Sequence, residues 1–462
     1  MLFSKALYVQ GLKKARTAGI GMAATVFIIN AIYALSEAEF TLHSTFPYTE
    51  GCARAIKEWE IAPFIPIAFL FSFFLVSSVF SFLNNRNGSD FYHSIPQKRP
   101  CVFLSFMASI FTWISSVVFG TVLVNFVIFS LGENYTVSFS RTLYEALGYT
   151  ASLLVIVCVI ALCRVIAGTK TTFILYTACL LSAPRFAIYL FKEYLSSSNP
   201  SICIEKTLLN SNLIAIEKSS YFSIIQFLEG GKSNSSISLF VLLSIEALVF
   251  LALGTYFYNK RKSEIAGQSS PPKAAHLFFK SLATFSLLAL GFYAQTSVTS
   301  FNINMIIFVI LSLLLYFLLD LLVVKSPLKA FKAIPAFLIS AVLAITLVGS
   351  THLTAEVYKR SNPTFEEISS ITIADPKYNK ELLHYKNVAV DSDEAKTVFV
   401  KLLQKTSEKN YKLKDNEITI KLTLKNGEEK YRDVQFLSNI YQDPDLLIIV
   451  DEVQKVVNQQ KS

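Results

Sequence analysis

Charged residues are scarce in this chain. Asp, Glu, Lys and Arg make up 16% of its 462 residues, whereas hydrophobic residues make up 53%. A typical soluble domain contains about 25% charged residues. This deficit excludes a single large soluble core, and it indicates that most of the chain uses lipid as its solvent.

Candidate catalytic and metal-binding residues are also few. The five histidines are scattered along the sequence, and none has Cys, Asp or Glu at the spacing of a metal site. The Gly-x-Ser-x-Gly motif of serine hydrolases does not occur. Gly231-Lys232-Ser233 resembles the end of a phosphate-binding loop, but Gln226 stands where that motif needs a glycine. We therefore expect no catalytic residue, no metal and no cofactor in this chain.

Long apolar stretches are present instead. A membrane-spanning helix needs about 20 mainly apolar residues, and about nine stretches meet this need. They are 18–36, 61–83, 102–131, 144–166, 171–195, 237–258, 277–297, 303–324 and 331–350. The predicted fold is therefore a polytopic α-helical membrane protein of about nine transmembrane helices. The short polar break at 297–304 predicts a tight helical hairpin, and a single crossing in 277–324 would move the C-terminus to the other side.

The positive charge, +9 overall, lies mainly in the loops. With the N-terminus inside, the cytoplasmic segments are the basic ones, as the positive-inside rule requires. Their basic residues are Lys5, Lys13, Lys14, Arg16, Arg86, Lys98, Arg99, Arg164, Lys170, Lys260, Arg261, Lys262, Lys273, Lys280, Lys325, Lys329 and Lys332. An odd number of spans then places the C-terminus outside. A basic face on a soluble domain, the mark of nucleic-acid binding, is not indicated.

The two ends of the chain differ from its membrane part, 18–350. Residues 1–17 suit an amphipathic helix on the inner membrane surface, or a plain basic anchor. Residues 351–462 predict an extracytoplasmic α+β domain. Its expected elements are a strand at 368–374, a helix at 393–408, a hairpin of 417–424 and 429–436 around Asn426-Gly427, and a helix at 444–457. We expect it to serve recognition or assembly, or else to be a rigid lid or a folding module.

Ionisable residues lie at different depths in the predicted spans. Arg185 and Glu246 lie at similar depth in the fifth and sixth spans. Unpaired charges at this depth are costly, so the two would pair or would face a translocation path. Arg164 and Asp320 lie near inner ends, where their side chains could extend to the membrane surface.

Two cysteines fall in predicted external loops. They are Cys52 and Cys203. A disulfide persists on the outer side of a membrane, so these two could pair. The other four cysteines lie in or at spans, where we expect small apolar fillers.

The loop 84–100, between the second and third spans, is the most informative stretch. It contains the run Asp90-Phe91-Tyr92-His93-Ser94-Ile95-Pro96-Gln97-Lys98-Arg99. Ser89 or Asp90 could cap a short helix, which Pro96 would end. A short amphipathic helix at the cytoplasmic face suits docking into a groove of another protein. The simpler interpretation is a basic loop that only sets topology.

The run at 90–99 closely resembles the FYHSLPIKR signature of bacterial ABC-2-type exporter permeases, with Ile95 for Leu and Gln97 for Ile. Arg261-Lys262-Ser263-Glu264-Ile265-Ala266-Gly267 is similar to the RKxExAG stretch of the same permeases. The end domain, with Leu424-Lys425-Asn426-Gly427 in its hairpin, resembles their external C-terminal domain. Those permeases usually have a six-span core, so the seventh to ninth spans would be additions.

The resemblance implies an exporter permease in the bacterial cell membrane, with a separate cytoplasmic ATPase that binds ATP and Mg²⁺. A second permease, identical or related, is also implied. The loop would be the coupling helix seated in a groove of the ATPase. Its contact residues would be Asp90, Phe91, Tyr92, His93, Ser94, Ile95, Pro96, Lys98 and Arg99, and a second cytoplasmic contact would comprise Arg261, Lys262, Glu264 and Gly267. The alternative is a membrane sensor or assembly protein whose external domain binds a ligand.

Overall fold

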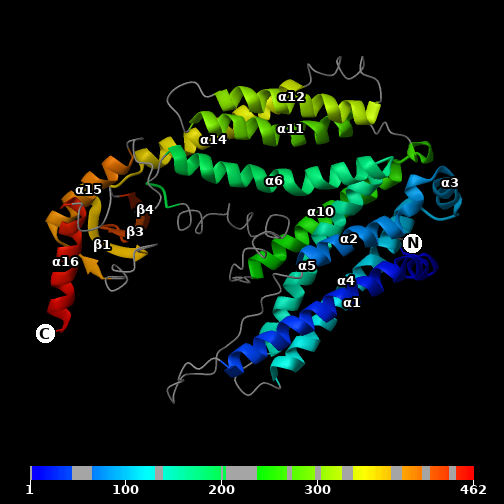
Figure 1. Ribbon diagram of the computed structural model, residues 1–462, viewed down its shortest axis with the longest axis horizontal. Coiled ribbons are helices and arrows are strands. Elements are labelled where there is room, and N and C mark those ends of the chain that lie inside the picture. Colours follow the sequence, from blue (N-terminus) through cyan, green and yellow to red (C-terminus); the bar gives the residue numbers. More distant parts are fainter. Residues whose placement is uncertain are drawn as a thin grey trace. The chain divides into compact units, whose positions relative to one another are not determined.

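The computed structural model describes residues 3–43, 65–130, 139–198, 201–203, 237–267, 273–296, 303–324, 337–375, 388–407, 417–435 and 444–461. Figure 1 shows the helices and strands of the chain. The chain divides into two compact units. The first unit comprises Met1–Arg185, Ala215–Leu282 and Leu319–Phe331. The second unit comprises Phe186–Ile214, Ala283–Leu318 and Lys332–Ser462.

The first unit is built from helices. They are α1 (Lys5–His43), α2 (Ile65–Val79), α3 (Arg86–Ser94), α4 (Arg99–Ser130), α5 (Phe139–Ile166), the first part of α6 (Lys170–Ser198), α10 (Ile237–Lys260), the start of α11 (Lys273–Thr296) and the end of α12 (Ile303–Val324). Two short 3-10 turns, η2 (Ser81–Asn84) and η3 (Ser263–Ile265), follow α2 and α10. The core contains the buried rings of Phe80, Phe103 and Phe106.

Helices α1 and α4 lie side by side (Figure 1). Small residues let the two backbones approach, because a side chain at Gly19 would overlap the ring of Trp113. The buried amides of Asn30 and Asn125 bond each other across the same interface, with Asn125 Nδ2 donating to Asn30 Oδ1 at 2.8 Å. Small residues and paired amides are typical of helices that associate in lipid.

Seven helices within the described residues are long and apolar enough to cross a membrane: α1, α4, α5, α6, α11, α12 and α14 (Leu338–Arg360). The other two predicted stretches are also helical, namely α2, whose apolar part Phe69–Val79 is shorter, and α10. Helices α11 and α12 are separate, as the predicted hairpin requires. Helix α12 also exposes Ile303, Ile310 and Leu314, and outward-facing apolar side chains in this number favour contact with lipid.

The N-terminal segment is not a separate surface helix, which corrects the prediction for residues 1–17. Helix α1 runs without a break from Lys5 to His43. Leu7 and Ala15 in its first turns are buried, and the Ser4 amide donates to Ser105 Oγ at 2.9 Å. Packing against α4 therefore continues the helix through the predicted boundary at 17.

The second unit contains the remaining parts of α6, α11 and α12, all of α14, and an α+β domain. The described strands β1 (Ile368–Asp375), β2 (Ala389–Val390), β3 (Glu417–Leu424) and β4 (Glu429–Gln435) form an antiparallel sheet in the order β2-β1-β3-β4. Helices α15 (Asp393–Ser407) and α16 (Pro444–Lys461) lie beside the sheet (Figure 1). They share its core through Phe399 and Val453. The predicted strands, hairpin and helices are confirmed, and Gly427 in the turn has a φ of 83° that favours glycine.

The boundary of this domain differs from the predicted one at 350. Helix α14 continues to Arg360, so the sheet domain begins only after that helix. Arg432 on β4 joins the two, because its Nε donates to Asn362 Oδ1 at 2.9 Å and its guanidinium lies 6.0 Å from the centre of the Tyr358 ring. Arg432 is 3% exposed, so the domain is held to the end of α14 by a buried charge.

Candidate functional site

The predicted short helix in the loop 84–100 is confirmed as α3, but its cap is different from the expected one. The side chain of Asn85 accepts a hydrogen bond from the Asn87 amide at 3.2 Å, and the helix therefore begins before Ser89 and Asp90. Ser89 is buried instead. The helix ends at Ser94, and extended Ile95 precedes Pro96 as a residue before proline favours.

The two faces of α3 have different surroundings. Tyr92 is 6% exposed, and its ring centre lies 4.1 Å from that of Phe82 and 5.6 Å from that of Phe106. Phe91 is 61% exposed, and Asp90 is also exposed. Tyr92 therefore anchors the helix, and the surface open to a partner consists of its other face. That face and the following turn comprise Asp90, Phe91, Ser94, Pro96, Gln97 and Lys98.

Helix α1 holds Tyr92 in place. The ammonium of Lys14 lies 4.4 Å from the centre of the Tyr92 ring, within the range of a cation–π interaction. Gln10 Nε2 donates to the Tyr92 hydroxyl at 2.8 Å. Sequence reasoning counted Lys14 only as a charge that sets orientation, because nothing local shows that it meets α3.

The second motif lies directly against the first. Arg261 is 3% exposed, and its guanidinium donates to the carbonyls of Leu83 at 3.0 Å, Ala167 at 2.9 Å and Val165. Burial lowers the pKa of Arg261 to about 10, so the group stays charged at pH 7. The amide of Gly267, which has a φ of 79°, donates to Gly168 O at 3.0 Å.

This packing corrects the role expected for Arg261. A buried side chain that bonds three carbonyls does not face a partner protein. Lys262 and Glu264 are exposed and remain candidates for the second contact. The segments 90–99 and 261–267 thus form one surface patch, and the buried side chain of Arg261 connects its parts.

Two further arginines bond helix ends at the same place. Arg99 Nη1 donates to the carbonyls of Asn259 and Arg261, at 3.1 and 2.8 Å, near the end of α10. Arg164 Nε and Nη2 both donate to Phe80 O, at 3.3 and 3.2 Å, just after α2. The last carbonyls of a helix lack internal partners and carry partial negative charge, which a guanidinium satisfies. Arg164 is 1% exposed, so the expectation that it extends to the surface is wrong.

His93 lies inside this arginine-rich region. Its ring centre is 6.0 Å from that of Tyr258, and within the described residues neither ring nitrogen has a hydrogen-bond partner. Burial and the charges of Arg99 and Arg261 lower the pKa of His93, against the smaller raising effect of Asp90. His93 is therefore neutral at pH 7, and its ring contributes packing rather than charge to α3.

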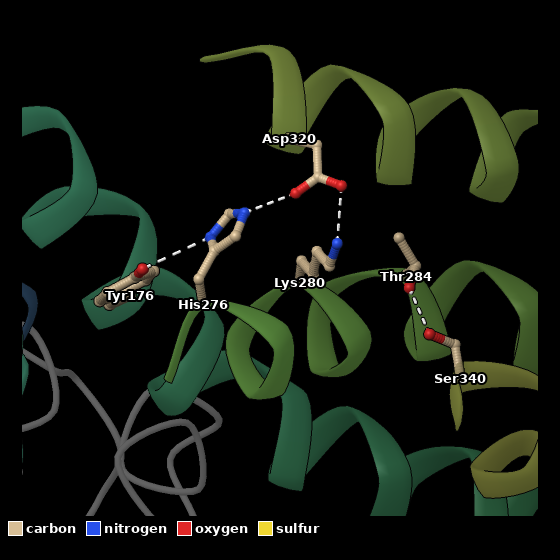
Figure 2. Close-up of polar contacts among 6 residues, drawn as sticks. All are labelled: Tyr176, His276, Lys280, Thr284, Asp320 and Ser340. Carbon is tan, nitrogen blue, oxygen red and sulfur yellow. Dashed lines mark hydrogen bonds and ion pairs between the residues drawn. The ribbon is translucent and has the colours of Figure 1, made fainter. Parts of the chain in front are cut away.

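A second polar group lies on α11 and α12 (Figure 2). Asp320 Oδ2 lies 2.7 Å from Lys280 Nζ, and its Oδ1 lies 2.7 Å from His276 Nε2. His276 Nδ1 lies 3.5 Å from the Tyr176 hydroxyl of α6. Asp320 is 2% exposed, so the expectation that it extends to the surface is also wrong. The spacing of His276 and Lys280 by one helical turn was the available signal, since residues four apart share a face.

The predicted pair Arg185 and Glu246 is not tested. The side chain of Arg185 lies outside the described residues. Helices α6 and α10 both pack against Val155 and Val159 of α5, which is compatible with neighbouring positions for the two helices. The pairing stays a prediction.

The predicted disulfide between Cys52 and Cys203 is likewise not tested. Cys52 lies outside the described residues. Cys203 is buried, with its sulfur 3.9 Å from Thr419 Oγ1, and it follows Ile202, which pairs with Arg432 of β4. Within the part of the chain that the structure describes, no group of three or more His, Cys, Asp or Glu could hold a metal ion.

Comparison with known proteins adds no relative. No family description, no curated protein and no solved structure matches the chain. The resemblance carried by 90–99 and 261–267 therefore rests on those residues, and function has to be argued from the geometry of the patch they form.

Proposed function

We propose that this chain is the transmembrane permease subunit of an ABC-type exporter. The observation that carries the proposal is the two-faced helix α3. It presents Asp90 and Phe91 outward, while Tyr92 fixes it to α1 and α4. A short helix with an exposed aromatic and acidic face, mounted on long apolar helices, suits a groove in a partner protein.

The same proposal places the chain in the bacterial cell membrane. Seven described helices have the length and apolarity for this, and the basic residues predict a cytoplasmic N-terminus. The α3 end of the helices is then cytoplasmic, and the domain after α14 is extracytoplasmic, with about nine spans in all.

Coupling in this proposal is mechanical. A separate ATPase binds ATP and Mg²⁺ and performs the hydrolysis, and this chain performs no bond chemistry. Movement of the ATPase displaces α3, and α3 has two connections inward. One passes from Tyr92 through Lys14 to α1, and the other passes through Arg261 to the ends of α2 and α5. Packed helices with such contacts switch between discrete arrangements, here inward- and outward-open states. A second permease, identical or related, completes the transporter.

The test is co-purification of the full chain from the cells that produce it, with the bound proteins examined for a nucleotide-binding ATPase. Phe91→Ala removes an exposed ring without disturbing the core, and should reduce bound ATPase at least about tenfold, as loss of an interface aromatic does. Phe365→Ala is the matched control, since Phe365 is also exposed, at 40%, but lies at the start of the sheet domain. The proposal fails if no nucleotide-binding protein accompanies the wild-type chain, or if F91A and F365A retain it equally. The first of those results would favour a sensor or assembly protein.

A further inference from the structure

A buried ionic cluster on α11 and α12 has no part in the coupling surface. Asp320 bonds two residues of α11, Lys280 and His276, each at 2.7 Å and each through a different carboxylate oxygen (Figure 2). The side chains of Lys280 and Asp320 are 5% and 3% exposed. Burying ionised groups is costly, and in helices as apolar as these they most often serve binding or transport.

The charges of Lys280 and Asp320 cancel. Each carboxylate oxygen of Asp320 already accepts a hydrogen bond, one from Lys280 and one from His276. His276 is the remaining member, and imidazole is the side chain that exchanges a proton near neutral pH. Its side chain is 12% exposed, compared with 3% for that of Asp320.

The hydroxyl of Tyr176 can form a hydrogen bond with Nδ1 of His276 in both protonation states of the ring. In the neutral ring with its proton on Nε2, that nitrogen donates to Asp320 and Nδ1 accepts from the Tyr176 hydroxyl. In the protonated ring both nitrogens donate, and the hydroxyl oxygen of Tyr176 turns from donor to acceptor. Neither state leaves a buried ring nitrogen without a partner.

The surroundings favour a proton over other ligands. The charged groups that face His276 are the carboxylate of Asp320 and the ammonium of Lys280. Beyond Tyr176 lie the thiols of Cys163 on α5 and Cys179 on α6, and the ring of Phe279 stacks on Tyr176 at 4.0 Å. No group of three metal-ligating side chains occurs here within the described residues.

We propose that His276, held between Asp320 and Tyr176, is a reversible proton-binding site. A proton bound there adds one positive charge to a cluster that is otherwise neutral. An uncompensated buried charge disfavours close packing. The contact of α11 with α12 around Asp320 is therefore tight when His276 is neutral, and it loosens as the pH falls through the titration range of His276. The inference is independent of any ATPase partner.

The direct test is ¹⁵N NMR of the full chain, labelled at its five histidines, in lipid nanodiscs between pH 5 and 8. The signal absent from His276→Gln belongs to His276, and the signal absent from His352→Gln provides an exposed reference. We expect a reversible titration whose midpoint falls by at least about one pH unit in Asp320→Asn, a tenfold loss of proton affinity. Asp320→Glu should restore it. A signal for His276 that does not titrate, or a midpoint unchanged in D320N, overturns the proposal.

A second measurement remains decisive if H276Q folds poorly. Tyr176→Phe keeps both ionisable partners but removes the acceptor for Nδ1–H, so the same midpoint should fall. Hydrogen exchange of amides in the first turns of α11, corrected for the intrinsic effect of pH, should rise from pH 8 to pH 5 in the wild type and in H352Q. A midpoint unchanged in Y176F, or exchange that does not respond to pH in the wild type, contradicts the proposal.

Discussion

The ammonium of Lys14 on α1 lies 4.4 Å from the centre of the Tyr92 ring on α3. The rings of Phe82 and Phe106 face the same ammonium at 5.0 and 5.7 Å. The neighbour of Tyr92, Phe91, points outward. Because Tyr92 is fixed from α1, the position of the exposed face of α3 depends on the first helix of the chain.

Replacing Lys14 should therefore loosen α3. Lys14→Met loses a half-buried cation–π contact with three rings, worth about 1–2 kcal/mol. Thermal unfolding in nanodiscs should show a lower midpoint, and amide exchange in α3 should rise. Lys13→Met is the control, because Lys13 is exposed on the same helix. Equal behaviour of K14M and K13M would mean that the contact contributes nothing.

Arg261 should not tolerate a change to lysine. Arg261→Lys keeps the charge, but an ammonium cannot reach the carbonyls of Leu83, Val165 and Ala167 with the planar fork of a guanidinium. We expect a loss of about 2–3 kcal/mol in stability, the scale of a buried hydrogen bond to a charged group. Lys262→Met, at the exposed neighbouring position, should be neutral. A stable R261K with unchanged amide exchange around residue 167 would refute this role.

The stability of α3 should depend on pH through His93. Burial and the nearby charges of Arg99 and Arg261 lower its pKa below the usual value of about 6.5. A lowered pKa means that the folded state prefers the neutral ring, so this stability is present above pH about 6.5 and is lost as the pH falls through the folded-state pKa. Amide exchange in α3, corrected for the intrinsic rate, should rise over that range. His93→Gln should abolish the dependence, whereas His352→Gln should keep it.

Arg432 should decide how firmly the α+β domain is held to α14. Arg432→Met leaves Asn362 Oδ1 without its donor and removes the charge near the last carbonyls of the helix. The expected result is faster protease cleavage at 361–364, with the domain itself still folded because its core residues are elsewhere. Lys425→Met, in the exposed hairpin turn, is the control. Cleavage at the wild-type rate in R432M would argue against the attachment.

The proposed topology can be tested by labelling. Single cysteines replace exposed Asn87 on α3 and exposed Asn426 in the hairpin, in a chain carrying Cys52→Ser. In intact cells a membrane-impermeant maleimide should label N426C and not N87C, and both should react in permeabilised cells. C52S without an added cysteine provides the background. If only N87C is labelled in intact cells, the orientation is the reverse of the proposed one. If N87C and N426C are labelled equally there, both lie on one side of the membrane, and the number of spans is even.

The hairpin and the long helices were predictable because their causes are local. Asn426-Gly427 between two alternating stretches specifies the β3–β4 turn, and Gly427 adopts the expected positive φ. Apolar stretches of about 20 residues likewise predict helices from length and composition alone. The loop motif 90–99 could be placed on a short helix for the same reason, although the cap was assigned to Ser89 or Asp90 rather than to Asn85.

The amino-acid sequence by itself determined most of the helices and strands, though not all their ends, and which loops carry positive charge. Only the tertiary structure decided what each charge meets. Arg261 bonds a carbonyl 178 residues away, and Lys280 pairs with an aspartate 40 residues away. Such partners depend on how helices pack, and no local pattern encodes this. The sequence therefore indicated the short helix in the loop 84–100 but not its attachment to Lys14 and Arg261. It also counted Lys280 and Arg164 as surface charges, although packing buries them both.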